Sequence, residues 1–434
     1  MKRKLIESLK RWKHSETRKP LILQGARQVG KTWLMKEFGK NHYKKYVYIN
    51  LDNNEKIASL FNLNYDTNRL IEALELEAGF KIEPSNTLII FDEIQECPKA
   101  LTSLKYFNED ANQYHIIVAG SLLGVAHHSG TGFPVGKVEF LNLYPLSFFE
   151  FLEALGEERF VDLLCKKDFE MISIFKDKYE DLLKKYCYIG GMPEVVQDFI
   201  INKDFKRVRK IQKDILQSYE KDFSKHISSN TVEKVRMLWK SIPSQLTKEN
   251  KKFIYNAVKS GGRAKEFETA LTWLESAGLI YKIHKIKKPA LPIGAYEDFD
   301  SFKLFILDVG LLGAMTNIEA KIILEKQAIF EEFKGAIAEQ YVLQQLKNIE
   351  NLPVFYWSNE TSRSELDFII QLGENVVPVE VKASINLQAK SLTNYIEKFK
   401  PNVAIRTSLA DYKTTDILMD IPLYAIEVIC ATDY

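Results

Sequence analysis

The sequence predicts an α/β protein that begins with a largely parallel sheet and ends with a second, smaller α/β region. Short apolar runs of strand length alternate with helical patterns in the first third, at residues 21–23, 87–94 and 115–121. A Gly-rich turn joins the first run to a helical segment, and the last third repeats the alternation after a mostly helical middle. Such alternation is typical of parallel strands connected by covering helices.

Composition excludes several broad classes of protein. The 434 residues are 46% hydrophobic and 27% charged, as in a folded chain with several domains. No apolar run approaches the roughly 20 residues that a membrane span needs, so we expect no membrane partner. The four cysteines form no CxxC pair, which argues against a zinc site or a disulfide framework. The basic N-terminus precedes no apolar segment, so we expect a cytoplasmic protein without a secretory signal.

The turn after the first strand carries the most specific motif. The segment GARQVGKT fits G-x-x-x-x-G-K-[ST] and lies between a strand and a helix, which is the context the motif requires. Its glycines allow amide groups to converge on phosphate oxygens, and its lysine places a cation beside the β- and γ-phosphates. The predicted nucleotide-binding residues are Gly25, Ala26, Arg27, Gln28, Val29, Gly30, Lys31, Thr32 and Trp33. We therefore predict a P-loop NTPase sheet that binds ATP with Mg²⁺.

The second buried strand ends in the acids that such a loop needs. Asp92 is predicted to hold Mg²⁺ together with the Thr32 hydroxyl, and Glu93 to act as general base toward the attacking water. Lys31 and Ser121, at the end of the third strand, complete the predicted catalytic set, with Ser121 as a polar sensor of the γ-phosphate. No arginine finger is evident between residues 122 and 140, where Lys137 is the basic candidate.

The remaining sequence predicts three further domains after an ATPase domain at residues 1–150. Residues 151–240 read as a helical subdomain. Residues 241–325 resemble a winged helix, because helices lead through Gly278 into a pair of strands. Residues 326–434 form the second α/β region, which opens with an amphipathic helix.

The last region carries a second constellation of charged residues. Glu339 lies on the opening helix, Asp367 in the strand ELDFIIQL, and Glu380 and Lys382 in the strand VPVEVKAS. Alternation along a strand places Glu380 and Lys382 on one face. Neighbouring carboxylates can bind a second Mg²⁺ or Mn²⁺, and an adjacent lysine can stabilise developing charge. The order of these elements resembles the PD-(D/E)XK nuclease superfamily, which implies a nuclease-like fold.

Over nearly its whole length the chain resembles a group of prokaryotic AAA-type ATPases, related to the AAA+ and STAND classes, that carry an uncharacterised C-terminal domain. The segments that carry the resemblance are GARQVGKT, LIIFDEIQ, AGSLLG, LYPLSFFEFL, YIGGMPEVV, FKLFILDVGLLGAM and ELDFII with VEVKAS. Roles in defence or DNA transactions have been proposed for relatives. Many relatives have Gly-Arg where this chain has Gly136 and Lys137, and lysine lacks the planar fork of arginine.

Three functional hypotheses follow. The first is Mg²⁺-dependent ATP hydrolysis coupled to a nuclease-like domain that interacts with nucleic acid. The second is an ATP-regulated, metal-dependent nuclease, and the third is an ATP-binding scaffold with little turnover. The Lys- and Arg-rich residues 203–225 and 282–288 are consistent with a solvated surface or with a DNA or RNA partner. A homo-oligomer or a protein partner remains an open alternative.

Overall fold

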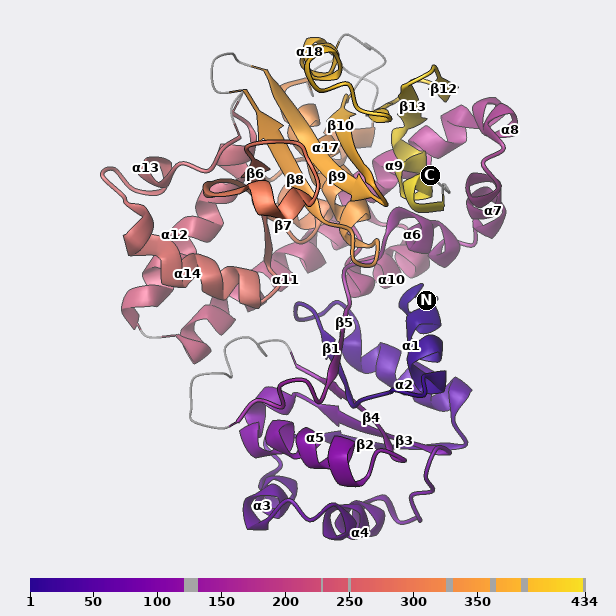
Figure 1. Cartoon of the computed structure of the whole chain (residues 1–434), viewed down its shortest axis with the longest axis vertical. Coiled ribbons are helices and arrows are strands. Elements are labelled where there is room, and N and C mark those ends of the chain that lie inside the picture. The colour runs from indigo at the N-terminus through magenta and orange to yellow at the C-terminus, as the bar shows by residue number, and fades with distance from the viewer. Residues whose placement is uncertain are drawn as a thin grey trace. The chain divides into compact units, whose positions relative to one another are not determined.

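The computed structural model divides into two compact units, which are described separately. It describes residues 1–120, 132–227, 229–248, 251–324, 331–359, 364–383 and 389–431. Residues 2–144 and 276–279 form the N-terminal unit, and the C-terminal unit comprises residues 145–275 and 280–434 with Met1 (Figure 1). The division at residue 144 lies close to the predicted boundary at 150, while the predicted boundaries at 240 and 325 stay predictions.

The N-terminal unit is a five-stranded parallel sheet in the order β2-β3-β4-β1-β5. Its strands are β1 (Leu21–Gln24), β2 (Lys45–Asn50), β3 (Thr87–Asp92), β4 (His115–Ala119) and β5 (Glu139–Asn142). Its helices are α1 (Leu5–His14), α2 (Lys31–His42), α3 (Glu55–Leu63), α4 (Thr67–Ala78) and α5 (Pro98–Asp110). The three predicted strands are β1, β3 and β4, and β2 and β5 complete the sheet.

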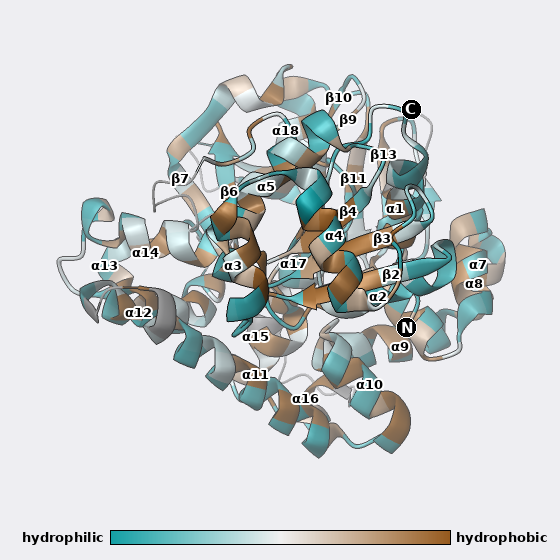
Figure 2. Cartoon of the chain, turned by 90° about the horizontal axis from the view of Figure 1, so that it is seen from below, coloured by the Kyte–Doolittle hydropathy of each residue, from teal (hydrophilic) through white to brown (hydrophobic). Residues whose placement is uncertain are grey.

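The core of the N-terminal unit explains why β3 reads as a continuous apolar run. Every residue of β3 is buried, because the strand lies inside the sheet and helices cover it (Figure 2). Ile89 and Phe91 pack with Ile116 and Val118 of β4 and with helix residues such as Leu104. Burial of both faces of a central parallel strand favours such apolar runs. Because the strands are parallel, the carboxyl ends of β1 and β3 lie at the same edge of the sheet.

The C-terminal unit combines helices with an eight-stranded mixed sheet in the order β12-β13-β11-β10-β9-β8-β6-β7. Its strands are β6 (Ile280–Ile286), β7 (Glu297–Ile306), β8 (Val354–Ser358), β9 (Glu365–Leu372), β10 (Asn375–Val381), β11 (Ala404–Ser408), β12 (Lys413–Thr414) and β13 (Leu418–Pro422). The hairpin β6–β7, predicted as part of a winged helix, continues this sheet through the pairing of Lys285 with Tyr356.

Helices occupy the predicted helical region and also occur in the rest of this unit. They are α6 (Phe148–Ala154), α7 (Glu158–Lys166), α8 (Phe169–Ile174), α9 (Lys176–Ile189), α10 (Pro193–Asn202), α11 (Phe205–His226), α12 (Ser229–Leu246), α13 (Tyr255–Val258), α14 (Ala264–Ser276), α15 (Val309–Met315), α16 (Ala320–Leu324), α17 (Glu331–Lys347) and α18 (Lys390–Phe399). Within the described residues, no helix is both long and apolar enough to cross a membrane.

Helix α17 departs from the predicted amphipathic pattern because all of residues 336–346 are buried. Its buried glutamines are satisfied by backbone groups of other segments. Gln340 both accepts from Ile306 N and donates to Ile306 O, at 3.1 and 2.7 Å. Gln344 accepts from Val309 N at 2.9 Å, and Gln345 accepts from Phe148 N at 2.7 Å. A buried polar group is tolerated only with such partners, so these bonds fix the helix in place.

The buried Asp308 connects two of the signature segments. Its carboxylate accepts from the backbone of Gly191 at 2.6 Å and Leu311 at 3.0 Å, and from the Gln344 amide at 3.0 Å. A Cβ at Gly190 would lie 2.1 Å from this carboxylate, and Gly190 has φ +76°. Gly190 is therefore required by its contact with Asp308, and a Cβ at Gly191 would lie 2.2 Å from the carbonyl oxygen of Leu146.

Candidate functional site: a phosphate-binding loop and a buried charge cluster

The predicted loop turns tightly between β1 and α2. Gly25 has φ +149°, and a Cβ there would lie 2.3 Å from the carbonyl oxygen of Leu143. Gly30, directly before α2, has φ +96°, and Gln28 also has a positive φ of +67°. Positive φ is accessible to glycine at little cost, so both glycines are explained by geometry. The loop thus presents its amides at the N-terminus of a helix, which is a favourable position for an anion.

Lys31 is folded back onto the loop that contains it. Its ammonium donates to Gly25 O at 2.7 Å and to Ala26 O at 2.8 Å, and its side chain is buried. Burial lowers the pKa of Lys31 to about 8, although Glu93 and Asp92 act in the opposite direction. Two carbonyl groups therefore satisfy a cation that the sequence predicts to contact phosphate.

Thr32 and Asp92 lie in direct contact at the ends of their elements. The Thr32 hydroxyl donates to Asp92 Oδ2 at 2.6 Å, and the Tyr48 hydroxyl of β2 donates to the same oxygen at 3.0 Å. Asp92 itself is buried. The two predicted oxygen ligands of Mg²⁺ are thus adjacent, and hydroxyl and carboxylate oxygens are the donors this ion takes. Tyr48 is a site residue that the motif search missed, because β2 carries no phosphate-binding signature.

Glu93 follows Asp92 in a left-handed backbone conformation with φ +51°. Its amide donates to Asp92 Oδ1 at 3.1 Å, and its side-chain carboxylate accepts from the Gln95 amide. Ser121 lies outside the described residues. Lys137, considered as a substitute for arginine, forms an ion pair with Glu109 at 2.9 Å within the same unit.

Arg3 is a second residue that sequence reasoning missed. It precedes α1, is buried, and donates to Val29 O in the phosphate-binding loop at 3.0 Å. Its other terminal nitrogen donates to Tyr144 O at 2.5 Å. The basic N-terminal segment gave no signal of this role, because one arginine among several surface cations looks like any other.

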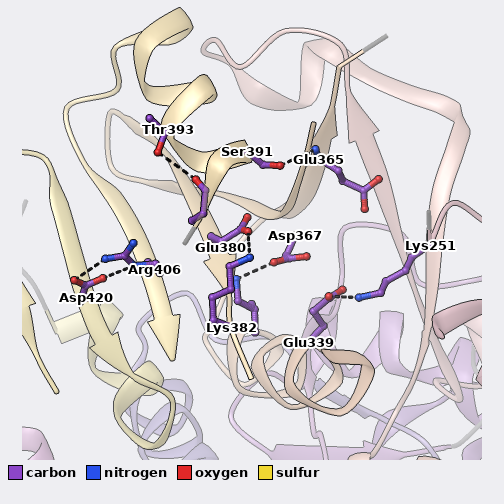
Figure 3. Close-up of polar contacts among 12 residues, drawn as sticks. Lys251, Glu339, Glu365, Asp367, Glu380, Lys382, Ser391, Thr393, Arg406 and Asp420 are labelled. Atoms are coloured by element: carbon purple, nitrogen blue, oxygen red, sulfur yellow. Dashed lines mark hydrogen bonds and ion pairs between the residues drawn. The ribbon is translucent and has the colours of Figure 1, made fainter. Parts of the chain in front are cut away.

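Four predicted residues of the C-terminal unit come together on α17, β9 and β10 (Figure 3). Strands β9 and β10 are antiparallel neighbours, so Asp367 and Glu380 lie on adjacent strands. Asp367 Oδ2 accepts from Val381 N at 2.8 Å, and Lys382 pairs with Glu380 Oε1 at 2.7 Å. Glu339 reaches the group from α17, and there it pairs with Lys251, which the sequence analysis did not single out.

Burial and neighbouring charges shift the pKa values of the acids in this cluster in different directions. Burial, together with the charges of Glu339 and Glu380, raises the pKa of Asp367 well above its usual range. Burial also raises the pKa of Glu380, against the effect of Lys382. Burial acts in the same direction on Glu339, but Lys251 and Lys303 outweigh it and lower the pKa of Glu339. Like charges that share a site favour protonation of one member, and here that member is Asp367.

The cluster does not fit a metal as it stands. Among the described residues, no three histidine, cysteine or acidic side chains are arranged to hold a metal ion. Glu339 Oε2 and Glu380 Oε2 are nonetheless buried without a hydrogen-bond partner in the described part of the chain. Burying a carboxylate oxygen without a hydrogen-bond partner costs free energy. The cluster therefore differs from a structural ion-pair network in which every charged group is paired.

Sequence comparisons match three segments to known families. Residues 17–152 match a family described as an AAA domain. Residues 180–322 and 334–426 match two domains of unknown function, DUF8612 and DUF4143. No curated protein matches the chain.

Comparison of folds finds similar solved structures with low sequence identity. A Walker-type ATPase of Pyrococcus abyssi is 15% identical with a TM-score of 0.46, covering 71% of this chain and 95% of that chain. The Orc1 protein of Aeropyrum pernix in complex with DNA is 12% identical with a TM-score of 0.29, covering 72% and 90%. Cdc6p of Pyrobaculum aerophilum is 13% identical with a TM-score of 0.27, covering 74% and 94%.

The sheet, the loop and the matched segment together give the N-terminal unit the fold of an ATPase-like P-loop module that is similar to an AAA domain. The predicted P-loop fold is therefore confirmed for this unit. The winged-helix and nuclease-like domains are not confirmed, because residues 180–322 and 334–426 match only families of unknown function.

Proposed function

We propose that the N-terminal unit binds ATP with Mg²⁺ and hydrolyses it, and that the nucleotide state is coupled to the C-terminal unit. The observation that carries this proposal is the proximity of Lys31 and Thr32, at the start of α2, to Asp92, at the end of β3. A lysine, a hydroxyl and a carboxylate beside a helix N-terminus are the groups that a Mg²⁺–triphosphate complex requires.

Each residue has a specific task in this proposal. Lys31 exchanges the carbonyls of Gly25 and Ala26 for phosphate oxygens when the nucleotide enters. Thr32 and Asp92 would hold the Mg²⁺ ion through their side-chain oxygens, and the ion would offset the negative charge of the β- and γ-phosphates. Glu93 leaves Gln95 and accepts a proton from the attacking water.

ATP binding is tested by calorimetry on Lys31→Ala. Removing the ammonium is expected to weaken ATP binding at least roughly a hundredfold, because hydrogen bonds to charged partners in a dry site are strong. Lys40→Ala, an exposed lysine of the same helix, is the matched control and should bind like the wild type. Unchanged affinity in a folded Lys31→Ala variant would reject the site.

Hydrolysis is distinguished from mere binding by Glu93→Gln. In an ATPase this change should leave ATP bound while phosphate release falls roughly a hundredfold or more. Glu96→Gln, at an exposed acid three residues further on, is the control. A wild type that releases no phosphate above background, with or without DNA and RNA, would favour the scaffold alternative.

A second candidate function is cleavage of nucleic acid by the C-terminal unit. It is supported by the convergence of Asp367, Glu380 and Lys382 on neighbouring strands. The test incubates single-stranded DNA, duplex DNA and RNA with Mg²⁺ or Mn²⁺, with and without ATP. Cleavage that disappears in Glu380→Ala supports the nuclease, and absence of cleavage of all three substrates leaves the ATPase proposal alone.

A further inference from the structure

Lys251 enters the acidic cluster from a segment far away in the sequence. It pairs with Glu339 although the two residues are 88 positions apart, and its side chain is only 14% exposed. Figure 3 shows it approaching Glu339 from outside the strands that carry Asp367 and Glu380. A lysine on an irregular segment would ordinarily extend into water, so burial against a carboxylate needs an explanation.

The segment that carries Lys251 is held firmly against β7. Phe253 N donates to Phe302 O at 2.8 Å, and the two rings are stacked with centroids 5.4 Å apart. Lys252 donates to Ser301 Oγ at 2.9 Å, and Ile254 N donates to Gln245 Oε1 at 2.7 Å. These contacts aim Lys251 inward while its neighbour Lys252 stays exposed.

Three lysines neutralise the cluster in this conformation. Lys303 pairs with Glu365 at 2.6 Å and Lys382 pairs with Glu380 at 2.7 Å, in addition to the pair of Lys251 with Glu339. Lys303 is wholly buried in β7, and Lys382 directly follows the strand of its own partner. Lys251 is the one of these three that lies between helices, on the connection from α12 to α13.

The two partnerless oxygens lie on the acids that lysines already hold. Glu339 uses Oε1 for Lys251, and Glu380 uses Oε1 for Lys382, while Oε2 of each is buried without a hydrogen-bond partner. A group of buried carboxylate oxygens with spare acceptor capacity suits a cation that can contact several of them at once. The Lys251 ammonium, which is paired with Glu339, contacts fewer of these oxygens than such a cation would.

We propose that the Lys251 ammonium holds the place of a divalent cation and keeps this cluster metal-free. The class of ligand is a hard divalent ion such as Mn²⁺ or Mg²⁺. The inference is independent of the ATPase proposal. It bears on the nuclease candidate only as a regulation of the same carboxylates.

The test is Mn²⁺ binding without nucleotide, measured by calorimetry. All proteins carry Asp92→Asn, so that the N-terminal unit contributes no metal signal. Lys251→Met is expected to bind Mn²⁺ at least roughly tenfold more tightly than its parent, a difference of about 1.4 kcal/mol. Lys240→Met, at an exposed lysine of α12, is the control and should equal the parent, and adding Glu339→Gln to Lys251→Met should remove the gain.

Two results would overturn the proposal: equal Mn²⁺ affinity with and without Lys251, or no binding by a folded Lys251→Met variant. A second measurement uses the unaltered protein, in case the variant does not fold. Lys251 should react with acetic anhydride roughly tenfold more slowly than Lys252, and saturating Mn²⁺ should reduce that difference. Equal reactivity of the two lysines without metal would contradict the burial that the proposal requires.

Neither failure affects the ATPase proposal, because ATP affinity and phosphate release are read separately from nucleotide-free Mn²⁺ binding. Conversely, an inactive N-terminal unit leaves the metal titration interpretable. Cleavage assays are kept out of this test, so a cluster that binds Mn²⁺ without cutting nucleic acid would still support the role of Lys251.

Discussion

The phosphate-binding loop and the C-terminal charge cluster both contain a lysine in contact with protein oxygens, but they are assembled in different ways. Lys31 is held by carbonyls five and six residues away in its own loop. Lys251 is held by a glutamate 88 residues away, on a buried helix. A site built from consecutive residues depends on local turns. A site built from distant elements depends on the packing of the whole unit.

The difference also shows in what surrounds each lysine. The loop offers backbone groups, whose charges are fixed and do not titrate. The cluster offers carboxylates whose pKa values move in opposite directions, with Asp367 raised and Glu339 lowered. The first arrangement suits a constant anionic ligand. In the second arrangement, the protonation of the carboxylates changes when a charged group enters or leaves the cluster.

The largest expected effect is on the buried network that supports α17. Asp308→Ala leaves the backbone N–H groups of Gly191 and Leu311 without this acceptor and removes one of the two hydrogen bonds of the Gln344 amide nitrogen. Each unsatisfied buried donor costs about 1–3 kcal/mol, so we expect the free energy of unfolding of the C-terminal unit to fall by about 3–5 kcal/mol. Hydrogen exchange of the α15 and α17 amides measures this loss.

The control for that variant is Asp300→Ala, which removes an exposed acid of β7 and should change the free energy of unfolding by about 0.5 kcal/mol or less. ATP affinity of Asp308→Ala should stay within roughly twofold of the wild type, since the loop depends on local geometry. A large loss of ATP affinity in a folded Asp308→Ala protein would break the proposed contrast between the two sites.

An intermediate effect is expected from pH. Lys31 must be protonated to contact phosphate, and its pKa in the free protein is lowered to about 8, chiefly by burial. ATP affinity should therefore fall as pH rises through 8, by roughly tenfold between pH 7 and pH 9. Calorimetry across this range measures it. Affinity that stays constant up to pH 9 would show that the lysine is not the titrating contact.

The contribution of Lys31 to folding stability depends on pH in the opposite direction. Because the ordinary pKa of lysine is 10.5, the unfolded state binds more protons than the folded state between about pH 8 and 10.5. This lysine therefore destabilises the fold below pH 8, and its unfavourable contribution decreases as the pH rises through that window. The Lys31→Met variant serves as the control for the pH dependence of folding stability, since it has no group that titrates at that position.

The smallest expected effect concerns Tyr48, which donates to the same Asp92 oxygen as Thr32. Tyr48→Phe removes one hydrogen bond worth about 0.5–1.5 kcal/mol and should raise the KM for Mg²⁺–ATP severalfold with little change in kcat. Steady-state kinetics measures both constants. Tyr46→Phe on the same strand is the control, and a fall in kcat alone would assign Tyr48 a different role.

Much of the N-terminal fold was predictable because its signals are local. The apolar runs of β1, β3 and β4, the two loop glycines and the acids after β3 all lie within a few residues of what they indicate. Strands β2 and β5 were missed because they lie at the sheet edges and are only partly buried. Edge strands need fewer apolar residues, so their pattern is weak.

The C-terminal site was predicted only in part. Glu339, Asp367, Glu380 and Lys382 were found from the order of their elements, and the structure brings them together. Lys251 and Lys303 were not, since nothing in their neighbourhoods distinguishes them from surface lysines. Helix α17 was expected to face water on one side, but backbone groups of distant segments satisfy its glutamines.

The sequence alone located the phosphate-binding loop, because glycine spacing and strand context are signals carried by neighbouring residues. Tertiary structure alone decided which lysines became buried partners of acids, and which glycines in YIGGMPEVV were needed beside Asp308. The physical reason is that the energy of a buried charge depends on every group packed around it, and packing brings together residues that the sequence keeps far apart.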